Sequence, residues 1–169
     1  MDEPFVDDFE KINHDDYNGL FRLVKKIVKK LLGRERASMM LALAYLHPNI
    51  GAFYQIGTNV MVLNKLVLEG IELVSDDKNK KKAYVFSLLL HEYLHAVGII
   101  NETQVRNLVL AISLKIFGQN HLVTKFSVGN PFQIFNGLRK VILQIAVNKK
   151  DNKVVFIDKF DADNANYFI

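Results

Sequence analysis

The chain has 169 residues, with 22 Lys and Arg against 18 Asp and Glu, and its formal net charge is +4 with the five histidines neutral. Half of the residues are hydrophobic and 24% are charged, a composition that excludes an intrinsically disordered chain. There is no cysteine, so a disulfide scaffold, a thiol nucleophile and a Cys-ligated metal site are excluded. A bound metal would have to be held by His, Asp and Glu.

The first ten residues, MDEPFVDDFE, are acidic and lack the cationic start and apolar run of a secretory signal. No apolar stretch approaches the length that spans a bilayer. We therefore expect a cytoplasmic protein with no membrane contact. The sequence contains no repeat, linker or change in composition, which favours a single domain over residues 1–169, with frayed segments at 1–14 and 158–169.

Apolar residues recur at helical spacing after Asp16, and Gly33 follows them, so the first predicted helix lies between these two positions. A second, short helix is predicted over residues 36–46, ended by Pro48. Residues 50–63 are rich in β-branched and aromatic side chains around Gly57-Thr58-Asn59. This pattern predicts two short strands, or one strand with a bulge.

The second half of the chain is predicted to be mainly helical. Asn64 is suited to cap a helix, Gly98 and Gly118 to end two others, and Pro131 to begin the last. The resulting elements are helices over residues 65–73, 81–97, 102–117 and 131–147, a loop over 75–82 and a late strand over 153–157. The predicted fold class is α+β, mostly helical, with a small sheet packed beside the 81–97 helix.

The predicted 81–97 helix is apolar nearly all round, which indicates burial, yet it contains His91-Glu92-Tyr93-Leu94-His95. Residues four apart on a helix lie on one face, so both imidazoles could bind one metal ion. Glu92 would flank the ion and serve as general base for a water molecule. Alternatively, the histidines bond to backbone carbonyls and Glu92 lies at the surface. Burying three such side chains is costly without strong partners, which favours the metal site.

The stretch LLLHEYLHAVGIINE resembles the active-site helix of the zincin metallopeptidases, and the preceding run IGAFYQIGTNVMVLNK lies where zincins have their edge strand. The resemblance covers about residues 50–121 and is closest to small archaeal HExxH proteins. It implies a zincin-like fold, a Zn²⁺ cofactor, a peptide or protein substrate, His91 and His95 as ligands, and Glu92 as the general base.

A catalytic zinc normally takes three protein ligands and a water, so a third ligand is needed. The position that bears the third histidine in the metzincin pattern is Asn101 here, which is a poor ligand. Two candidates remain. His121 follows the predicted helix stop at Gly118 and would complete a three-histidine site. Glu102 is the alternative, although it could simply pair with Arg106 in the first turn of its own helix. The sequence favours His121.

Two functions are compatible with these patterns. The first is a zinc-dependent peptidase. The second is a nucleic-acid-associated or interaction domain with a structural or vestigial metal site, because residues 103–150 contain seven Lys and Arg and no acid. Such a basic segment could make weak nucleic-acid contacts. The sequence does not indicate the substrate preference or the oligomeric state.

Overall fold

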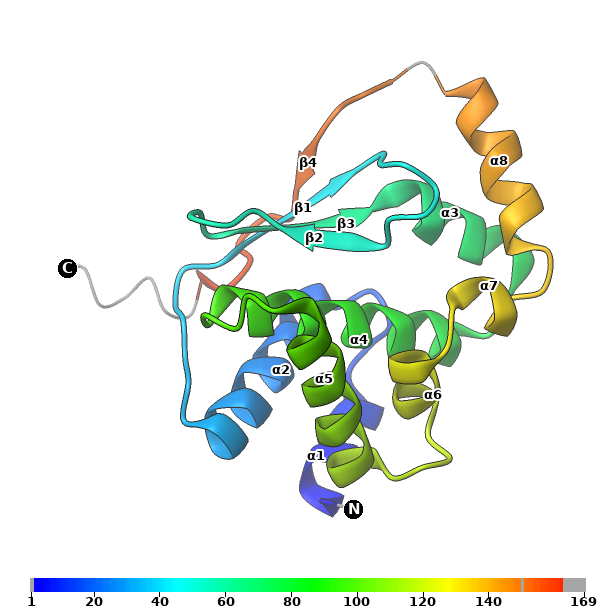
Figure 1. Ribbon diagram of the computed structural model, residues 1–169. Helices are drawn as coiled ribbons and strands as arrows, with labels where there is room; N and C mark the ends of the chain where they lie inside the picture. Colours follow the sequence, from blue (N-terminus) through cyan, green and yellow to red (C-terminus); the bar gives the residue numbers. More distant parts are fainter. Residues whose placement is uncertain (1, 150, 163–169) are drawn as a thin grey trace.

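The structure is a computed structural model, and it describes residues 2–149 and 151–162. In the described residues the fold is α+β, with eight helices and a four-stranded mixed sheet (Figure 1). The helices are α1 (Glu3–Lys11), α2 (Tyr17–Leu32), α3 (Lys65–Val74), α4 (Lys78–Ala96), α5 (Glu102–Phe117), α6 (Leu122–Val128), α7 (Pro131–Ile134) and α8 (Leu138–Asn148). The strands are β1 (Met40–Ala44), β2 (Ala52–Tyr54), β3 (Val60–Asn64) and β4 (Val155–Phe156).

The strands lie in the order β2-β3-β1-β4. The central pair, β1 and β3, is parallel, with Met40 opposite Val60 and Ala44 opposite Asn64. The two outer strands run antiparallel to their neighbours. Because β2 pairs only with β3, its other edge is free of strand partners within the described sheet.

Helix α4 lies at the centre of the molecule, with the sheet on one side and α2 and α5 on the other (Figure 1). Its buried side chains include Phe86, Leu89 and Leu94, and they belong to one continuous apolar core that also contains residues of α2, α5, β1 and β3. The prediction of a central, buried helix here is confirmed, although α4 begins at Lys78, earlier than predicted, because Asp77 caps it.

The predicted helix over residues 36–46 is wrong, because β1 occupies this segment. Its sequence, Met-Leu-Ala-Leu-Ala, consists of good helix formers. Alternation decides the outcome: Leu41 enters the main core, whereas Ala42 and Ala44 face the opposite side of the sheet. The pairing with β3 comes from residues far along the chain, and local propensity does not reveal it.

Two other predictions about secondary structure need correction, and one helix was not predicted. Residues 3–11, expected to be frayed, form α1, because Phe9 is buried against Phe86 and Phe117. The segment after Gly118 contains an additional helix, α6. The predicted helix over residues 131–147 is divided into α7 and α8, because Gly137 adopts a left-handed conformation with φ 77° between them. The predicted frayed end falls partly on residues 163–169, outside the described residues.

The predicted pair of strands over residues 50–63, the Asn64 cap of α3 and the helix between Asn101 and Gly118 are confirmed. Among the described residues, no helix combines the length and apolar character required to cross a membrane.

Candidate metal centre

The last turns of α4 carry His91, Glu92 and His95. The two imidazoles lie one turn apart, with ring centroids separated by 5.1 Å. Both are largely buried, with side-chain exposures of 22% for His91 and 15% for His95. Between them Tyr93 points into the core, where its hydroxyl group bonds to the backbone of Arg36. The helix therefore presents both histidines on one side, as the spacing predicts.

A tight reversal after α4 brings Glu102 to these histidines. Gly98 adopts φ 102°, which only glycine reaches readily, and Asn101 caps α5 by accepting a hydrogen bond from the backbone N–H of Gln104. Glu102 is the first residue of α5, so the reversal places its carboxylate beside the last turns of α4. The three residues form a group whose ligand atoms all lie within 4.8 Å of one another.

The Glu102 carboxylate contacts both imidazoles. Its Oε1 lies 3.0 Å from His91 Nε2, and its Oε2 lies 3.0 Å from His95 Nε2. Arg106 also reaches Oε1, with its Nε at 3.1 Å. These cationic and polar partners outweigh the effect of partial burial and lower the pKa of Glu102. Glu102 is therefore ionised near neutral pH and available as an anionic ligand.

The contact between His95 and Glu102 itself requires a cation. The Nδ1 atom of His95 lies 2.8 Å from the carbonyl oxygen of Ile99, and a carbonyl only accepts, so Nδ1 carries the proton. In the neutral ring, Nε2 then carries a lone pair and no proton. This lone pair faces the Glu102 Oε2 atom, which also has only lone pairs to offer. Either a second proton or a metal ion must lie between them. A His ligand whose other nitrogen donates to a backbone carbonyl is the usual arrangement at metal sites.

Two imidazoles and one carboxylate form a donor set that suits zinc in catalytic sites. Bonds of about 2.0–2.2 Å to a tetrahedral ion place its ligand atoms about 3.3–3.6 Å apart. The ligand atoms of the three side chains all lie within 4.8 Å of one another, so a bound ion requires only side-chain adjustments. Burial lowers the pKa of His91, and this effect exceeds the opposing influence of Glu102. A neutral imidazole is the form that binds metal. The residues present therefore fit a divalent ion.

Glu92 lies beside this cluster and is only 6% exposed. Burial, reinforced by the nearby Glu102 carboxylate, raises the pKa of Glu92 to about 8, although a hydrogen bond from the backbone N–H of Tyr54 acts in the opposite direction. A carboxyl group whose pKa is close to neutrality can both accept and return a proton. The alternative of a surface Glu92 is thereby excluded.

The cluster lies between two cavities. The larger, a cleft of about 660 Å³, is lined by His91 and Glu92 and extends toward α6, α7 and the start of α8. The smaller, about 190 Å³, is lined by His95 and by Tyr54 and Ile56. Ala52, the first residue of β2, lines the larger cavity, and Tyr54, its last residue, lines the smaller one. Strand β2 therefore runs from one cavity to the other past the cluster.

Sequence reasoning did not identify Arg36, which fixes the end of β2. Its guanidinium group donates to the Tyr54 hydroxyl at 2.6 Å, the Ala96 carbonyl at 3.0 Å and the Thr58 carbonyl at 2.7 Å. The Tyr54 hydroxyl in turn donates to the Thr58 carbonyl, so it is engaged in structure and is not free to bind an oxyanion. Nothing in the local sequence signals these contacts, because they join three separate segments.

His121 is not brought to the cluster, contrary to the preference derived from the sequence. It is the N-cap of α6, where its Nδ1 accepts a hydrogen bond from the backbone N–H of Val123 at 3.2 Å. Its ring stacks on Phe117, and its Nε2 lies 3.5 Å from Glu10. The two ring nitrogens therefore have partners in α6 and α1. The group of side chains that could hold a metal ion contains Glu102, the alternative candidate, and not His121.

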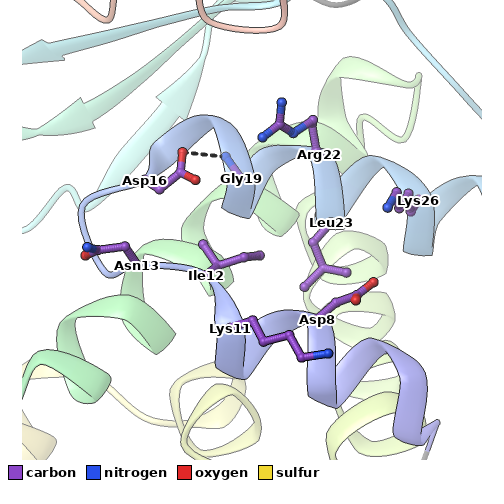
Figure 2. A pocket seen from close by; sticks show the side chains of 9 residues that line it. All are labelled: Asp8, Lys11, Ile12, Asn13, Asp16, Gly19, Arg22, Leu23 and Lys26. Carbon is purple, nitrogen blue, oxygen red and sulfur yellow. Dashed lines mark hydrogen bonds between the residues drawn. The ribbon is translucent and has the colours of Figure 1, made fainter.

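A further cavity, of about 420 Å³, lies between α1 and α2 (Figure 2). Its polar lining includes Asp16, whose carboxylate accepts a hydrogen bond from the backbone N–H of Gly19 as the cap of α2. None of the predicted site residues lines this cavity. We therefore assign no part of the candidate metal centre to it.

Comparison of the chain with protein-family models, curated proteins and solved structures gave no match.

Proposed function

We propose that this protein is a zinc-dependent peptidase in which His91, His95 and Glu102 hold the metal and Glu92 is the general base. The observation that carries the proposal is the position of the Glu102 carboxylate, 3.0 Å from both Nε2 atoms. This contact completes a three-ligand set beside a nearly buried acid and an open cleft.

A divalent ion bound there would supply Lewis acidity, which polarises the scissile carbonyl and makes a water molecule more acidic. Glu92 removes the proton as the water oxygen bonds to the carbonyl carbon. It then delivers that proton to the amine as the C–N bond breaks. Its burial beside the cluster keeps bulk water away from this proton transfer.

The edge of β2 that has no strand partner in the described sheet supports a peptide as substrate. In the pairing of β2 with β3, the Gly51 carbonyl accepts a hydrogen bond from the Asn64 N–H, and the Gln55 N–H donates to the Val60 carbonyl. Backbone groups alternate in direction along an antiparallel strand, so those of Ala52 and Tyr54 point away from the sheet. The Tyr54 N–H meets Glu92 there. An extended peptide that added to this edge would therefore pass beside the general base.

The exposure of the cluster argues against a purely structural metal. Structural zinc sites are closed by four protein ligands, whereas catalytic sites keep one position open. Only three ligating groups meet in the described residues, and each of them adjoins a cavity or is half exposed. His91 lines the larger cleft, His95 lines the smaller cavity, and Glu102 is 52% exposed. This arrangement leaves room for a water molecule and a substrate.

The test is cleavage of a mixture of unstructured peptides of known sequence, followed by mass spectrometry. We expect the zinc-loaded protein to generate defined new termini, chelation to stop cleavage, and added zinc to restore it. Glu92→Gln is the matched control, because the amide retains the shape of the side chain and loses its basicity. We expect it to bind zinc and to be slower by about 10²–10⁴-fold. Cleavage at the same rate by this variant would exclude the proposed mechanism.

A further inference from the structure

The charged side chains that α5 to α8 contribute to the lining of the larger cleft are both arginines. Arg106 and Arg139 line the cleft, and residues 103–150 contain no Asp or Glu. The one acidic side chain among the lining residues is Glu92, next to the metal cluster. The cleft therefore has an acidic group at one end and cationic groups along the facing wall.

The two arginines differ in what they contact. Arg106 is already paired with Glu102. The guanidinium carbon of Arg139 lies 4.3 Å from the centroid of the Phe132 ring, which also lines the cleft. Arg139 has no carboxylate partner among the described residues. The aromatic ring thus orients a guanidinium group whose hydrogen-bonding capacity for an anion is unused.

The position of Arg139 is unfavourable for the protein itself. It lies in the first turn of α8, which has no acidic residue there and no side-chain cap. A cation near the positive end of a helix dipole is destabilising, whereas an anion is stabilising. An anionic group on a ligand would relieve this cost, and a guanidinium group matches the two oxygens of a carboxylate.

We propose that Arg139 binds a carboxylate of the substrate, which makes it a specificity-determining residue of the peptidase. This inference rests on the proposed function. Antiparallel pairing is the more stable mode of strand addition, and β2 runs from the larger cleft toward the smaller. A peptide antiparallel to β2 therefore enters the Arg139 cleft with its C-terminal part. The carboxylate belongs either to an Asp or Glu side chain after the scissile bond or to the C-terminus of the peptide.

The test measures binding separately from hydrolysis, with zinc-loaded Glu92→Gln protein as the background. Three pools of otherwise randomised octapeptides serve as probes: blocked peptides containing one Glu, blocked peptides containing Gln instead, and the Gln pool with a free C-terminus. Affinity selection and mass spectrometry give the enrichment of each pool. We expect enrichment of about three- to tenfold for one or both carboxylate pools over the blocked Gln pool.

Arg139→Gln should reduce that enrichment to about one, and the matched variant Lys140→Gln should retain it. The Glu pool and the free-terminus pool distinguish the two sources of the carboxylate. Equal binding of all pools, no binding of any pool, or equal losses in both variants would overturn the inference. Binding of a DNA oligonucleotide through Arg139 in place of the peptides would also overturn it.

The same experiment separates this inference from the proposed function. Hydrolysis by the parent protein without a preference for carboxylates would leave the peptidase intact and remove the role of Arg139. Carboxylate-selective binding that depends on Arg139, without hydrolysis by the parent, would support the binding role and reject the peptidase.

Discussion

The Glu102 carboxylate lies against His91, 11 positions earlier in the chain, with 3.0 Å between Oε1 and Nε2. It also contacts His95, so one acidic side chain joins both histidines of α4. This relationship depends on the reversal at Gly98 and the cap at Asn101.

Zinc affinity should therefore depend on Glu102 and be independent of His121. We expect about one zinc per chain, no tight binding after His95→Ala, and at least about tenfold weaker binding after Glu102→Gln, because the amide carries no charge. His121→Asn is the matched control, since asparagine can retain the cap of α6, and its affinity should equal that of the parent. Competition with a zinc-binding indicator measures all four proteins. Weaker binding in His121→Asn than in Glu102→Gln would reverse the ligand assignment.

The contrast between Glu102 and His121 shows which parts of the site can be predicted from the sequence. The pair His91 and His95 could be predicted because helical spacing alone places residues four apart on one face. The third ligand lies on another helix, and its approach is set by the conformation of Gly98, which no periodic pattern encodes. His121 is isolated from other charges in sequence but contacts Phe117 and Glu10 in space.

The same distinction applies to the fold. The cap at Asn64 and the stops at Gly33 and Gly118 are local signals, and these helix ends were predictable. Strand β1 was not, because Met40 and Leu41 are helix formers whose strand partners lie 20 residues away. Helix α1 was also missed, since its stability depends on the burial of Phe9 by α4 and α5.

The cleft beside the cluster should be sensitive to the size of residue 51. A Cβ atom at Gly51 would lie 2.8 Å from the Tyr84 hydroxyl oxygen and 3.1 Å from a Leu88 methyl group. Tyr84 is 4% exposed, so it has little room to move. We expect Gly51→Ala to destabilise the protein by about 1–3 kcal/mol and to weaken peptide binding, while zinc binding is retained.

A double variant tests this explanation directly. Adding Tyr84→Phe to Gly51→Ala removes the nearest clashing atom, and we expect part of the stability and peptide binding to return. Urea denaturation and the peptide-selection assay measure the two effects. If Tyr84→Phe adds its own loss and restores nothing, close approach to the hydroxyl group is not the cause.

The described end of the chain should be important for stability through Asp161. Its Oδ1 lies 2.9 Å from Lys25 Nζ, and its Oδ2 accepts a hydrogen bond from the Met39 N–H at 2.9 Å. Both members of the ion pair are buried. Asp161→Asn leaves a buried ammonium group without its counter-charge, and we expect a loss of about 3 kcal/mol in the free energy of unfolding.

The exposed Asp158 provides the control for this substitution. Asp158→Asn removes the same charge from the same segment and should change the unfolding free energy by no more than about 0.5 kcal/mol. Equal urea midpoints for the two variants would show that the buried ion pair contributes nothing specific.

Acid should destabilise the protein in part through His121. Its Nδ1 must be unprotonated to accept the Val123 N–H, and burial, which outweighs the opposing Glu10 carboxylate, lowers the pKa of His121 below its ordinary value. The unfolded chain therefore binds more protons than the folded chain between the lowered pKa and about 6.5, the ordinary value. In that interval the free energy of unfolding increases with pH, and stability is lost as pH falls through it.

Two variants separate the titration of His121 from its role as a helix cap. His121→Asn retains a capping oxygen without a titrating group, so its free energy of unfolding should depend less steeply on pH between 7.5 and 5 than that of the parent. His121→Ala should show the same shallow dependence on pH. Its free energy of unfolding should also be lower than that of His121→Asn by about 1 kcal/mol at every pH, because the cap is absent. Urea denaturation across this range measures both quantities. Parallel curves for the parent and His121→Asn would contradict the assignment, because His91, whose pKa is also lowered, would then account for the acid sensitivity without His121.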